Sequence, residues 1–191
     1  GLDQDVIFRS PGIRPDIPPF LAAVEKGSVL TSEMEVFFQV CPCKIIAVTG
    51  SDGKTTTTTL ISEMLKNAGY TVHLGGNIGK PLLSEAGTMS PDDVAVLELS
   101  SFQLMTLSAS PDIAVFTNLS PNHLDIHKSM EEDALAKENI FRWQGEDGVA
   151  IFNRDNDLTH EMAGRAPGRV KLFSRQHALE EGVYVENGTI V

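Results

Sequence analysis

The feature that most constrains the fold is the alternation of short apolar runs with longer segments of helical character. Several of the short runs are apolar at nearly every position, as in VAVLEL and IAVF. Such runs are typical of central strands in a parallel sheet, which helices cover on both faces. Strands are predicted at residues 5–8, 44–49, 71–74, 94–98, 113–117 and 149–152.

Helices are predicted between these strands, where capping and helix-ending residues bracket the remaining segments. Asp16 and Thr31 precede two of them, and Gly27, Pro42 and Gly69 close three. The predicted helices span residues 17–26, 32–39, 55–68 and 130–143. This order of elements predicts an α/β fold, in which a mostly parallel sheet is flanked by helices.

The two ends of the chain depart from this alternation. The tail GVYVENGTIV has two alternating runs around Asn187-Gly188, which predicts a C-terminal β-hairpin. The opening GLDQDVIFRSPGI starts with Gly instead of Met and holds a predicted strand without a partner, so we expect a fragment of a longer protein. A domain boundary is predicted near residues 39–44, where CPC separates a helix from the next strand.

Composition limits the classes of partner. The chain has 191 residues, enough for one good-sized domain or for one domain with part of another. Its 15 Lys and Arg against 26 Asp and Glu give a net charge of −11, which argues against nucleic-acid or anionic-membrane surfaces and favours small molecules. No apolar run approaches the ~18 residues of a membrane span, so a cytosolic chain with reduced, structural Cys41 and Cys43 is expected.

The stretch AVTGSDGKTTTTTL joins a strand end, a glycine-rich loop and a helix start. Gly50 and Gly53 allow the backbone to curl and point its N–H groups at phosphates, while Lys54 supplies a positive charge and Thr55 a hydroxyl for Mg²⁺. The stretch departs from the pattern G-x-x-x-x-G-K-[ST], because the first glycine of that pattern falls on Val48. The loop with its flanking strand and helix still predicts nucleotide phosphate binding.

Asp52 places a carboxylate inside this predicted phosphate loop, next to Ser51. Because a carboxylate repels phosphate, we expect Asp52 to accept hydrogen bonds from neighbouring groups and to shape the loop without touching phosphate. Thr56 is assigned to the loop. The three threonines after it are interpreted as structural, since threonine hydroxyls can bond back to the preceding helical turn.

Five motifs follow one another along the chain: TGSDGKTTT, GGNIGKPL, LELSSFQL, NLSPNHLDIH and ALAKENIF. Their order and spacing resemble the central ATP-binding domain of the Mur ligases, and SPGI with TSEMEVFF resembles the end of the UDP-binding domain that precedes it. The resemblance implies that residues 1–41 are a Rossmann-like remnant of that domain with its linker. Residues 42–191 are then the central domain, incomplete at its C-terminal end.

Within this family, GNIG followed by ELSSFQL is similar to the ligases that add D-glutamate to UDP-N-acetylmuramoyl-L-alanine. Such an enzyme uses ATP to phosphorylate the substrate carboxylate, and the amine of D-glutamate then displaces phosphate to form an amide. The resemblance implies ATP and two Mg²⁺ ions as cofactors and a monomer in the bacterial cytoplasm. Because the amino-acid-binding domain is absent, this chain alone is expected to be inactive.

Bringing a carboxylate up to a triphosphate requires concentrated positive charge, which metal ions supply. Glu98 ends an apolar strand, at the edge where open α/β sheets usually present functional side chains. By resemblance, Thr55 and Glu98 bind Mg²⁺, His123 binds the metal or lies beside it, and Asp125 orients the His123 loop. The matching family lysine, Lys137, is carbamylated by CO₂ and helps to hold the second ion. The predicted catalytic residues are Lys54, Glu98, His123 and Lys137.

Asn77, Ser100 and Gln103 are assigned to the muramoyl substrate by the same resemblance. From the sequence alone, Asn77 is equally a turn residue, Ser100 a helix cap and Gln103 a residue at a helix start. No role is assigned to Arg14, which is interpreted as solvated, or to His127, His160 and residues 153–157.

Other functions are compatible with parts of this pattern. A Mur-family or folylpolyglutamate-type ligase for another amino acid shares the phosphate loop and the histidine motif. A P-loop NTPase or kinase needs only the loop and an acidic strand end, and it shows phosphate release or transfer without a muramoyl acceptor. A nucleotide-binding regulatory module is a third alternative, which the presence of Lys54, Glu98, His123 and Lys137 disfavours.

Overall fold

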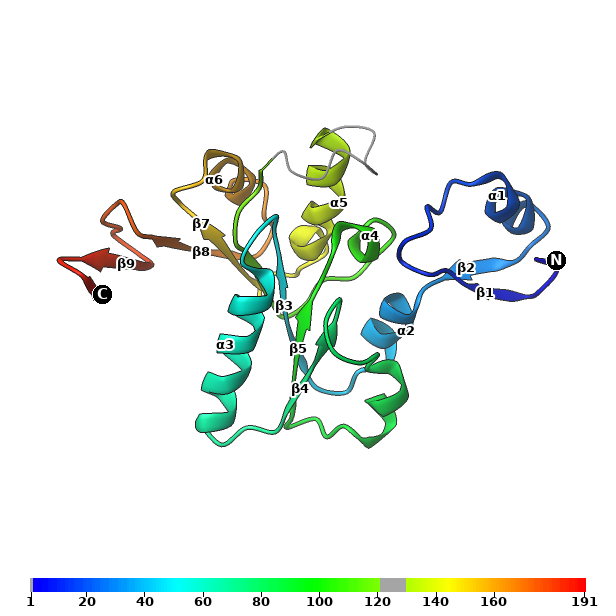
Figure 1. Cartoon of the computed structure of the whole chain (residues 1–191), viewed down its shortest axis with the longest axis horizontal. Coiled ribbons are helices and arrows are strands. Elements are labelled where there is room, and N and C mark those ends of the chain that lie inside the picture. Colours follow the sequence, from blue (N-terminus) through cyan, green and yellow to red (C-terminus); the bar gives the residue numbers. More distant parts are fainter. Residues whose placement is uncertain (1, 121–129) are drawn as a thin grey trace.

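The computed structural model describes residues 2–120 and 130–191 (Figure 1). Within these residues the main sheet has eight strands in the order β10-β9-β8-β7-β6-β3-β5-β4. All neighbours in it pair in parallel except β9 and β10, which confirms the mostly parallel sheet. The strands are β3 (Lys44–Thr49), β4 (Val72–Gly76), β5 (Val94–Glu98), β6 (Ile113–Phe116), β7 (Val149–Asn153), β8 (Arg169–Ser174), β9 (Val183–Glu186) and β10 (Thr189–Ile190).

Helices flank this sheet (Figure 1). The helices of the described residues are α1 (Pro18–Glu25), which lies in the N-terminal unit, and α2 (Glu33–Val40), α3 (Lys54–Asn67), α4 (Ser101–Leu104), α5 (Met130–Arg142) and α6 (Asp157–Ala163), with a 3₁₀ helix, η1 (Leu83–Thr88). Four of the α-helices lie within a residue or two of their predicted positions. Among the described residues, no helix is both long and apolar enough to cross a membrane.

The main core lies between the sheet and the helices α2, α5 and α6. Phe116 and Phe152 from adjacent strands stack with their ring centroids 6.2 Å apart, and Phe141 of α5 meets Phe152 edge-on at 5.2 Å. Val48 and Val96 are buried but point away from this cluster, because successive strand residues face opposite sides of a sheet. On that second side α3 packs against β3, β4 and β5.

The N-terminal residues form a small unit beside the main sheet (Figure 1, blue). Strand β1 (Val6–Phe8) pairs in parallel with β2 (Val29–Thr31), and Ile7, Phe20 and Ala23 form a separate apolar cluster. The expectation that the first strand lacks a partner was therefore wrong, because the short run 29–31 carries no strong strand pattern. Helix α2 packs into the main core, and the boundary between residues 41 and 42 stays a prediction.

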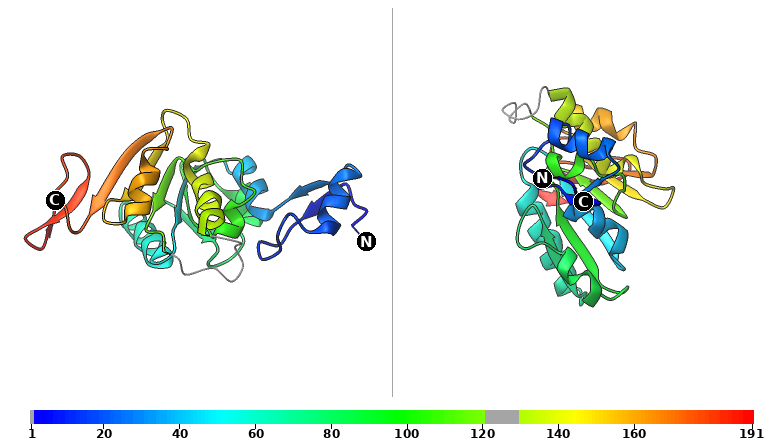
Figure 2. Two further views of the ribbon diagram at one scale, coloured as in Figure 1. Left: turned by 90° about the horizontal axis from the view of Figure 1, so that it is seen from above. Right: turned by 90° about the vertical axis from the view of Figure 1, so that its right-hand side faces the viewer.

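The C-terminal end confirms the predicted hairpin. Strands β9 and β10 are antiparallel, and the turn between them places Asn187 at φ 50° and Gly188 at φ 78°. Both angles are positive, which is the requirement that makes Asn-Gly the preferred two-residue turn. Figure 2 shows that this hairpin and the N-terminal unit lie at opposite ends of the long axis of the molecule.

Candidate nucleotide-binding and catalytic site

Four predicted motifs meet where the parallel strands β3, β4, β5 and β6 end. The register pairs Val48 of β3 and Gly76 of β4 with Glu98 of β5, and it pairs Thr49 with Phe116 of β6. The loops that leave these strands therefore emerge side by side at one edge of the sheet. In open α/β folds this carboxyl edge is the usual place for ligands.

The phosphate loop depends on Gly50 at its start and Gly53 at its end. Gly50 has φ 142°, and a Cβ there would lie 2.0 Å from the Thr117 hydroxyl oxygen. Gly53 has φ 78° and is the N-cap of α3. A side chain at position 50 would thus be strained and would collide with Thr117 and Asn118, which follow β6, so this close approach requires glycine.

The residues after β6 hold the loop in place. The Ser51 amide donates to the Asn118 carbonyl oxygen over 2.9 Å, and the Asp52 amide donates to Asn118 Oδ1 over 3.0 Å. Thr117 Oγ1 and Asn118 Nδ2 both donate to the Asp52 carbonyl oxygen, over 2.7 and 3.1 Å. Sequence reasoning missed Thr117 and Asn118, although Thr117 ends a predicted strand and Asn118 directly follows it.

The predicted role of Asp52 is therefore corrected in one respect. The loop is shaped by its main-chain amide and carbonyl, whereas its carboxylate is exposed and has no hydrogen-bond partner within the described parts of the chain. This arrangement explains how a phosphate loop tolerates an acidic residue.

Lys54 at the start of α3 folds back over its own loop. Its Nζ donates to the carbonyl oxygens of Gly50, at 3.1 Å, and Ser51, at 2.9 Å. A lysine held above the loop in this way is close to where phosphates would lie. One turn further along α3, Thr58 Oγ1 donates to the Lys54 carbonyl oxygen over 2.7 Å, as expected for a structural threonine.

Glu98 is the point at which three motifs converge. Only 2% of Glu98 is exposed, and its two oxygens accept from Thr55 Oγ1 at 2.6 Å and Asn77 Nδ2 at 2.9 Å. The Asn77 amide also donates to the Glu98 main-chain carbonyl oxygen over 2.7 Å. The phosphate loop, the GGNIG loop and the end of β5 are thus joined through one buried carboxylate.

This oxygen set fits a magnesium ion. Mg²⁺ prefers carboxylate, hydroxyl and phosphate oxygens, and it usually takes only one or two carboxylates from the protein. Glu98 with the Thr55 hydroxyl supplies such a set directly beside the phosphate loop. The described residues contain no cluster of three or more His, Cys, Asp or Glu side chains that could hold a metal by themselves, so the remaining ligands would be phosphate and water oxygens.

Lys137 on α5 is buried, with 2% of its surface exposed, and its Nζ donates to Asp133 one turn earlier. Burial lowers the pKa of Lys137, Asp133 opposes that effect, and the nearby positive charge of Lys54 lowers the pKa further. Lys137 therefore lies within electrostatic reach of the phosphate loop. A lowered pKa favours the neutral amine, which is the form that reacts with CO₂.

Ser100 and Gln103 form a reciprocal cap at the start of α4. The Gln103 amide donates to Ser100 Oγ at 3.4 Å, and the Ser100 amide donates to Gln103 Oε1 at 3.0 Å. The cap begins two residues after Glu98 and so fixes the chain that leaves β5. Contacts of Ser100, Gln103 or Asn77 with a substrate remain a prediction.

Two further predictions from the sequence concern the histidine motif and Arg14. The predicted metal residue His123, together with Asp125 and His127, lies outside the described residues. Arg14 was wrongly interpreted as solvated, because its guanidinium pairs with Asp16 and also with Glu132 of α5, 118 positions along the chain.

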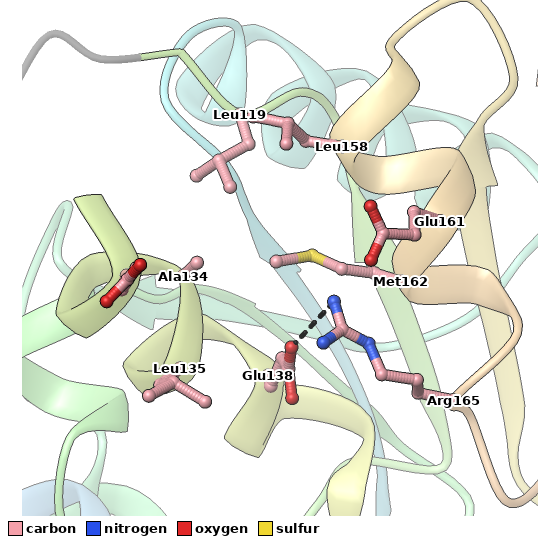
Figure 3. A pocket seen from close by; sticks show the side chains of 9 residues that line it. Leu119, Ala134, Leu135, Glu138, Leu158, Glu161, Met162 and Arg165 are labelled. Atoms are coloured by element: carbon pink, nitrogen blue, oxygen red, sulfur yellow. Dashed lines mark ion pairs between the residues drawn. The ribbon is translucent and has the colours of Figure 1, made fainter.

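A pocket of about 340 Å³ lies between α5 and α6 (Figure 3). Its floor is apolar, and Arg165 Nη2 forms an ion pair with Glu138 Oε1 at 3.0 Å across its wall. None of the predicted site residues that the structure describes lines it. The lining residues are Leu119, Glu131, Ala134, Leu135, Glu138, Leu158, Glu161, Met162 and Arg165.

Comparison with known proteins agrees with the motifs. Residues 48–187 match the family model described as the Mur ligase middle domain. A UDP-N-acetylmuramoylalanine--D-glutamate ligase from Acetivibrio thermocellus is 58% identical over 187 residues, and one from Clostridium kluyveri is 54% identical over 188 residues. These alignments cover 98% of this chain but only 40% and 41% of the two relatives, so the chain spans about two fifths of their length.

Solved structures of lower identity share the fold. A MurF structure from Acinetobacter baumannii aligns with a TM-score of 0.63 at 18% identity, covering 95% of this chain and 46% of that one. The UDP-N-acetylmuramate:L-alanyl-gamma-D-glutamyl-meso-diaminopimelate ligase from Neisseria meningitides aligns with a TM-score of 0.65 at 16% identity, covering 97% of this chain and 66% of that one. At these identities the likeness establishes the architecture alone.

Proposed function

The chain belongs to the Mur ligase family, and on that premise we propose that it is the central, ATP-using part of a ligase that adds D-glutamate to UDP-N-acetylmuramoyl-L-alanine. The observation that carries the proposal is the convergence of three motifs on Glu98, through Thr55 and Asn77. A site for acyl phosphate formation must hold a triphosphate, a metal and a carboxylate substrate together, and this junction lies between the loops suited to each.

The chemistry proceeds in two balanced steps. A carboxylate oxygen of the muramoyl-alanine substrate attacks the γ-phosphorus of ATP, so that ADP leaves and an acyl phosphate forms. The amine of D-glutamate then attacks the acyl carbon, phosphate leaves, and the amine gives up a proton as the amide forms. Both steps depend on positioning and on neutralising negative charge.

The residues of this chain contribute binding and orientation. The N-terminus of α3, directly after Gly53, is suited to the phosphates, and Lys54 would turn from its loop carbonyls toward them. Glu98 and Thr55 would hold Mg²⁺, which supplies the charge neutralisation that the triphosphate requires. Ser100 and Gln103 would order the chain beside the muramoyl group. His123 is proposed to complete the metal site.

Lys137 is proposed to become carbamylated in the intact enzyme and to help hold a second Mg²⁺. Its neutral amine would attack CO₂, forming an N–C bond and releasing a proton, which converts a cation into a carboxylate-like group. Burial beside Asp133 and Lys54 supports this assignment. Labelling with ¹³C-bicarbonate should give a carbamate NMR signal that Lys137→Ala abolishes; a plain ammonium in the Mg²⁺-loaded enzyme would contradict it.

The test of the function is an assay of the full-length protein with ATP, UDP-N-acetylmuramoyl-L-alanine and a panel of amino acids. We expect amide formation with D-glutamate, together with equal release of ADP and phosphate. ATP hydrolysis without any amide product would favour a P-loop NTPase, and a preference for another amino acid would favour a different ligase of the family.

Lys54→Ala provides the matched variant for this assay. We expect at least a ~100-fold loss of ATP-dependent turnover, because the substitution removes the positive charge beside the developing phosphate charge. Lys66→Ala serves as its control, since Lys66 is exposed at the other end of α3 and pairs only with Glu63 among the described residues. Turnover retained by Lys54→Ala would overturn the phosphate-loop assignment.

A further inference from the structure

The segment between β1 and α1, residues 9–17, lies against the two helices that follow β5 and β6. It carries two arginines with different surroundings. Arg9 is 3% exposed, whereas Arg14 lies at the surface of the contact with its side chain 20% exposed. The two residues join the N-terminal unit to α4 and α5, respectively.

Arg9 fixes the segment to the main body. Its Nη1 donates to the Ile13 carbonyl oxygen over 2.8 Å, which closes the loop on itself. Its Nη2 donates to the Phe102 carbonyl oxygen of α4 and to Thr106 Oγ1, each over 3.1 Å. Because the buried Arg9 guanidinium donates both to its own segment and to residues of the main body, it fixes residues 9–13 in place next to Arg14.

The guanidinium of Arg14 binds two carboxylates, one on each of its edges. Asp16 of the same segment holds one edge of its guanidinium, with Nε–Oδ1 at 2.9 Å and Nη2–Oδ2 at 3.0 Å. The other edge donates to the Glu132 carboxylate of α5, with Nη2–Oε1 at 2.7 Å and Nη1–Oε2 at 3.1 Å. Paired bonds from a planar guanidinium fix direction as well as distance.

Glu132 belongs to the first turn of α5 and is followed directly by Asp133, the partner of Lys137. Asn139 Nδ2 ties the middle of the same helix to the Leu104 carbonyl oxygen of α4 over 2.9 Å. The start of α5 is therefore held from the N-terminal unit, and its middle is held from the chain that leaves β5.

We propose that Arg14 is a positioning residue of the ligase site, which acts by holding Glu132 and thereby fixes the first turn of α5 and the Asp133–Lys137 pair. The inference rests on the proposed function. It makes the geometry at Lys137 depend on the N-terminal unit, so that this unit contributes to catalysis. A displacement of ~1 Å at a reacting centre can cost about 100-fold in rate.

The test is a double-mutant cycle in the full-length protein, with Arg14→Met, Glu132→Gln and the combined variant. If Arg14 acts through Glu132, each single variant lowers kcat by about tenfold or more with KM for ATP unchanged, and the combined variant loses no more than either one. Arg14→Lys, which keeps the charge but loses the fork, should recover part of kcat.

Arg142→Ala is the matched control, because Arg142 pairs with Glu138 in the last turn of the same helix. We expect this variant to keep the kcat of the unaltered enzyme. Equal kcat values for Arg14→Met and Arg142→Ala would overturn the proposal. So would losses that multiply in the combined variant, since Arg14 would then act independently of Glu132.

Hydrogen exchange on this chain separates the inference from the proposed function. Arg14→Met should speed exchange of the amides of residues 134–137 by about tenfold relative to Arg142→Ala, because the first turn of α5 loses its paired contact with the N-terminal unit. If the full-length protein shows no ligase activity, the proposed function fails, and this measurement still decides whether Arg14 positions α5. Equal exchange in the two variants overturns that role.

Discussion

At the scale of single residues, the phosphate loop shows which contacts set its shape. Thr117 and Asn118 hold the main chain at Asp52, whereas the carboxylate of Asp52 has no partner within the described residues. A change confined to that side chain should leave the loop conformation intact. The acidic residue is tolerated because the loop does not depend on its charge.

Asp52→Asn should therefore change nucleotide affinity by less than about tenfold, or ~1.4 kcal/mol. Removing a negative charge near the phosphates should strengthen binding slightly, and this gain should shrink as salt screens the interaction. Calorimetric titration with Mg·ADP at low and high salt measures both effects. A loss of more than tenfold in affinity would show that the carboxylate itself supports the site.

Thr55→Val should destabilise the chain by about 1–3 kcal/mol, because it leaves one oxygen of the buried Glu98 carboxylate without its donor. Thr56→Val is the matched control, since Thr56 is exposed on the same helical turn. Urea unfolding of both variants measures the difference. Equal free energies of unfolding would mean that the Thr55–Glu98 bond contributes nothing net to the fold.

At the scale of elements, the sequence predicted the strands and helices that have a clear hydrophobic pattern within their own residues. The predicted bounds of β3 and β5 match the observed ones, because both strands have neighbours on each side and lack alternating polar residues. Strand β8 was missed because its sequence, RVKLFS, begins with exposed residues, and α4 was missed because four residues show no helical period. The Arg14–Glu132 pair was missed for a different reason, since no local pattern reports a partner 118 positions away.

The turn after β8 is organised by Asp155, from the NRDND segment to which no role was assigned. Burial opposes ionisation of this carboxyl, but hydrogen bonds from Ser174, His177 and the amides of Arg175 and Gln176 lower the pKa of Asp155 to about 2. The segment between β7 and α6 is thus joined to the turn that precedes the hairpin.

This shift predicts a loss of stability in acid. Because the folded pKa of about 2 lies below the ordinary value of 3.8, the contribution of Asp155 is present above about pH 4 and is lost as pH falls toward 2. Asp155→Asn should lower stability at pH 7 and flatten this part of the curve. Glu180→Gln, at an exposed position, is the control. Unfolding curves from pH 2 to 7 that are parallel for Asp155→Asn and the unaltered chain would contradict the assignment.

At the scale of the whole molecule, the site is assembled from distant parts of one chain. Thr55 lies on α3, Asn77 follows β4 and Glu98 ends β5, and the parallel register brings these three residues together. Sequence motifs predicted which residues gather, because each follows a strand end or lies on a predicted helix. The motifs could not predict that Glu98 is buried, or that the residues after β6 form hydrogen bonds with the phosphate loop. Both features depend on how closely the strands approach one another.

The chain taken alone should bind nucleotide weakly and make no amide. Its phosphate loop is local to β3 and α3 and is already held by Thr117 and Asn118, so Mg·ADP should bind through its phosphates. The chain spans about two fifths of the length of its curated relatives, at 40% and 41%, so we expect other parts of the ligase to complete the adenine and D-glutamate sites and to exclude water. Calorimetric titration with Mg·ADP, beside a coupled assay for phosphate and amide, measures both properties, with Lys54→Ala as the control for phosphate-dependent binding. Sub-micromolar binding, tighter than about −8 kcal/mol, would show that these residues contain the adenine pocket. Amide formation by this chain would show that its catalytic site is complete without the remaining parts of the full-length protein.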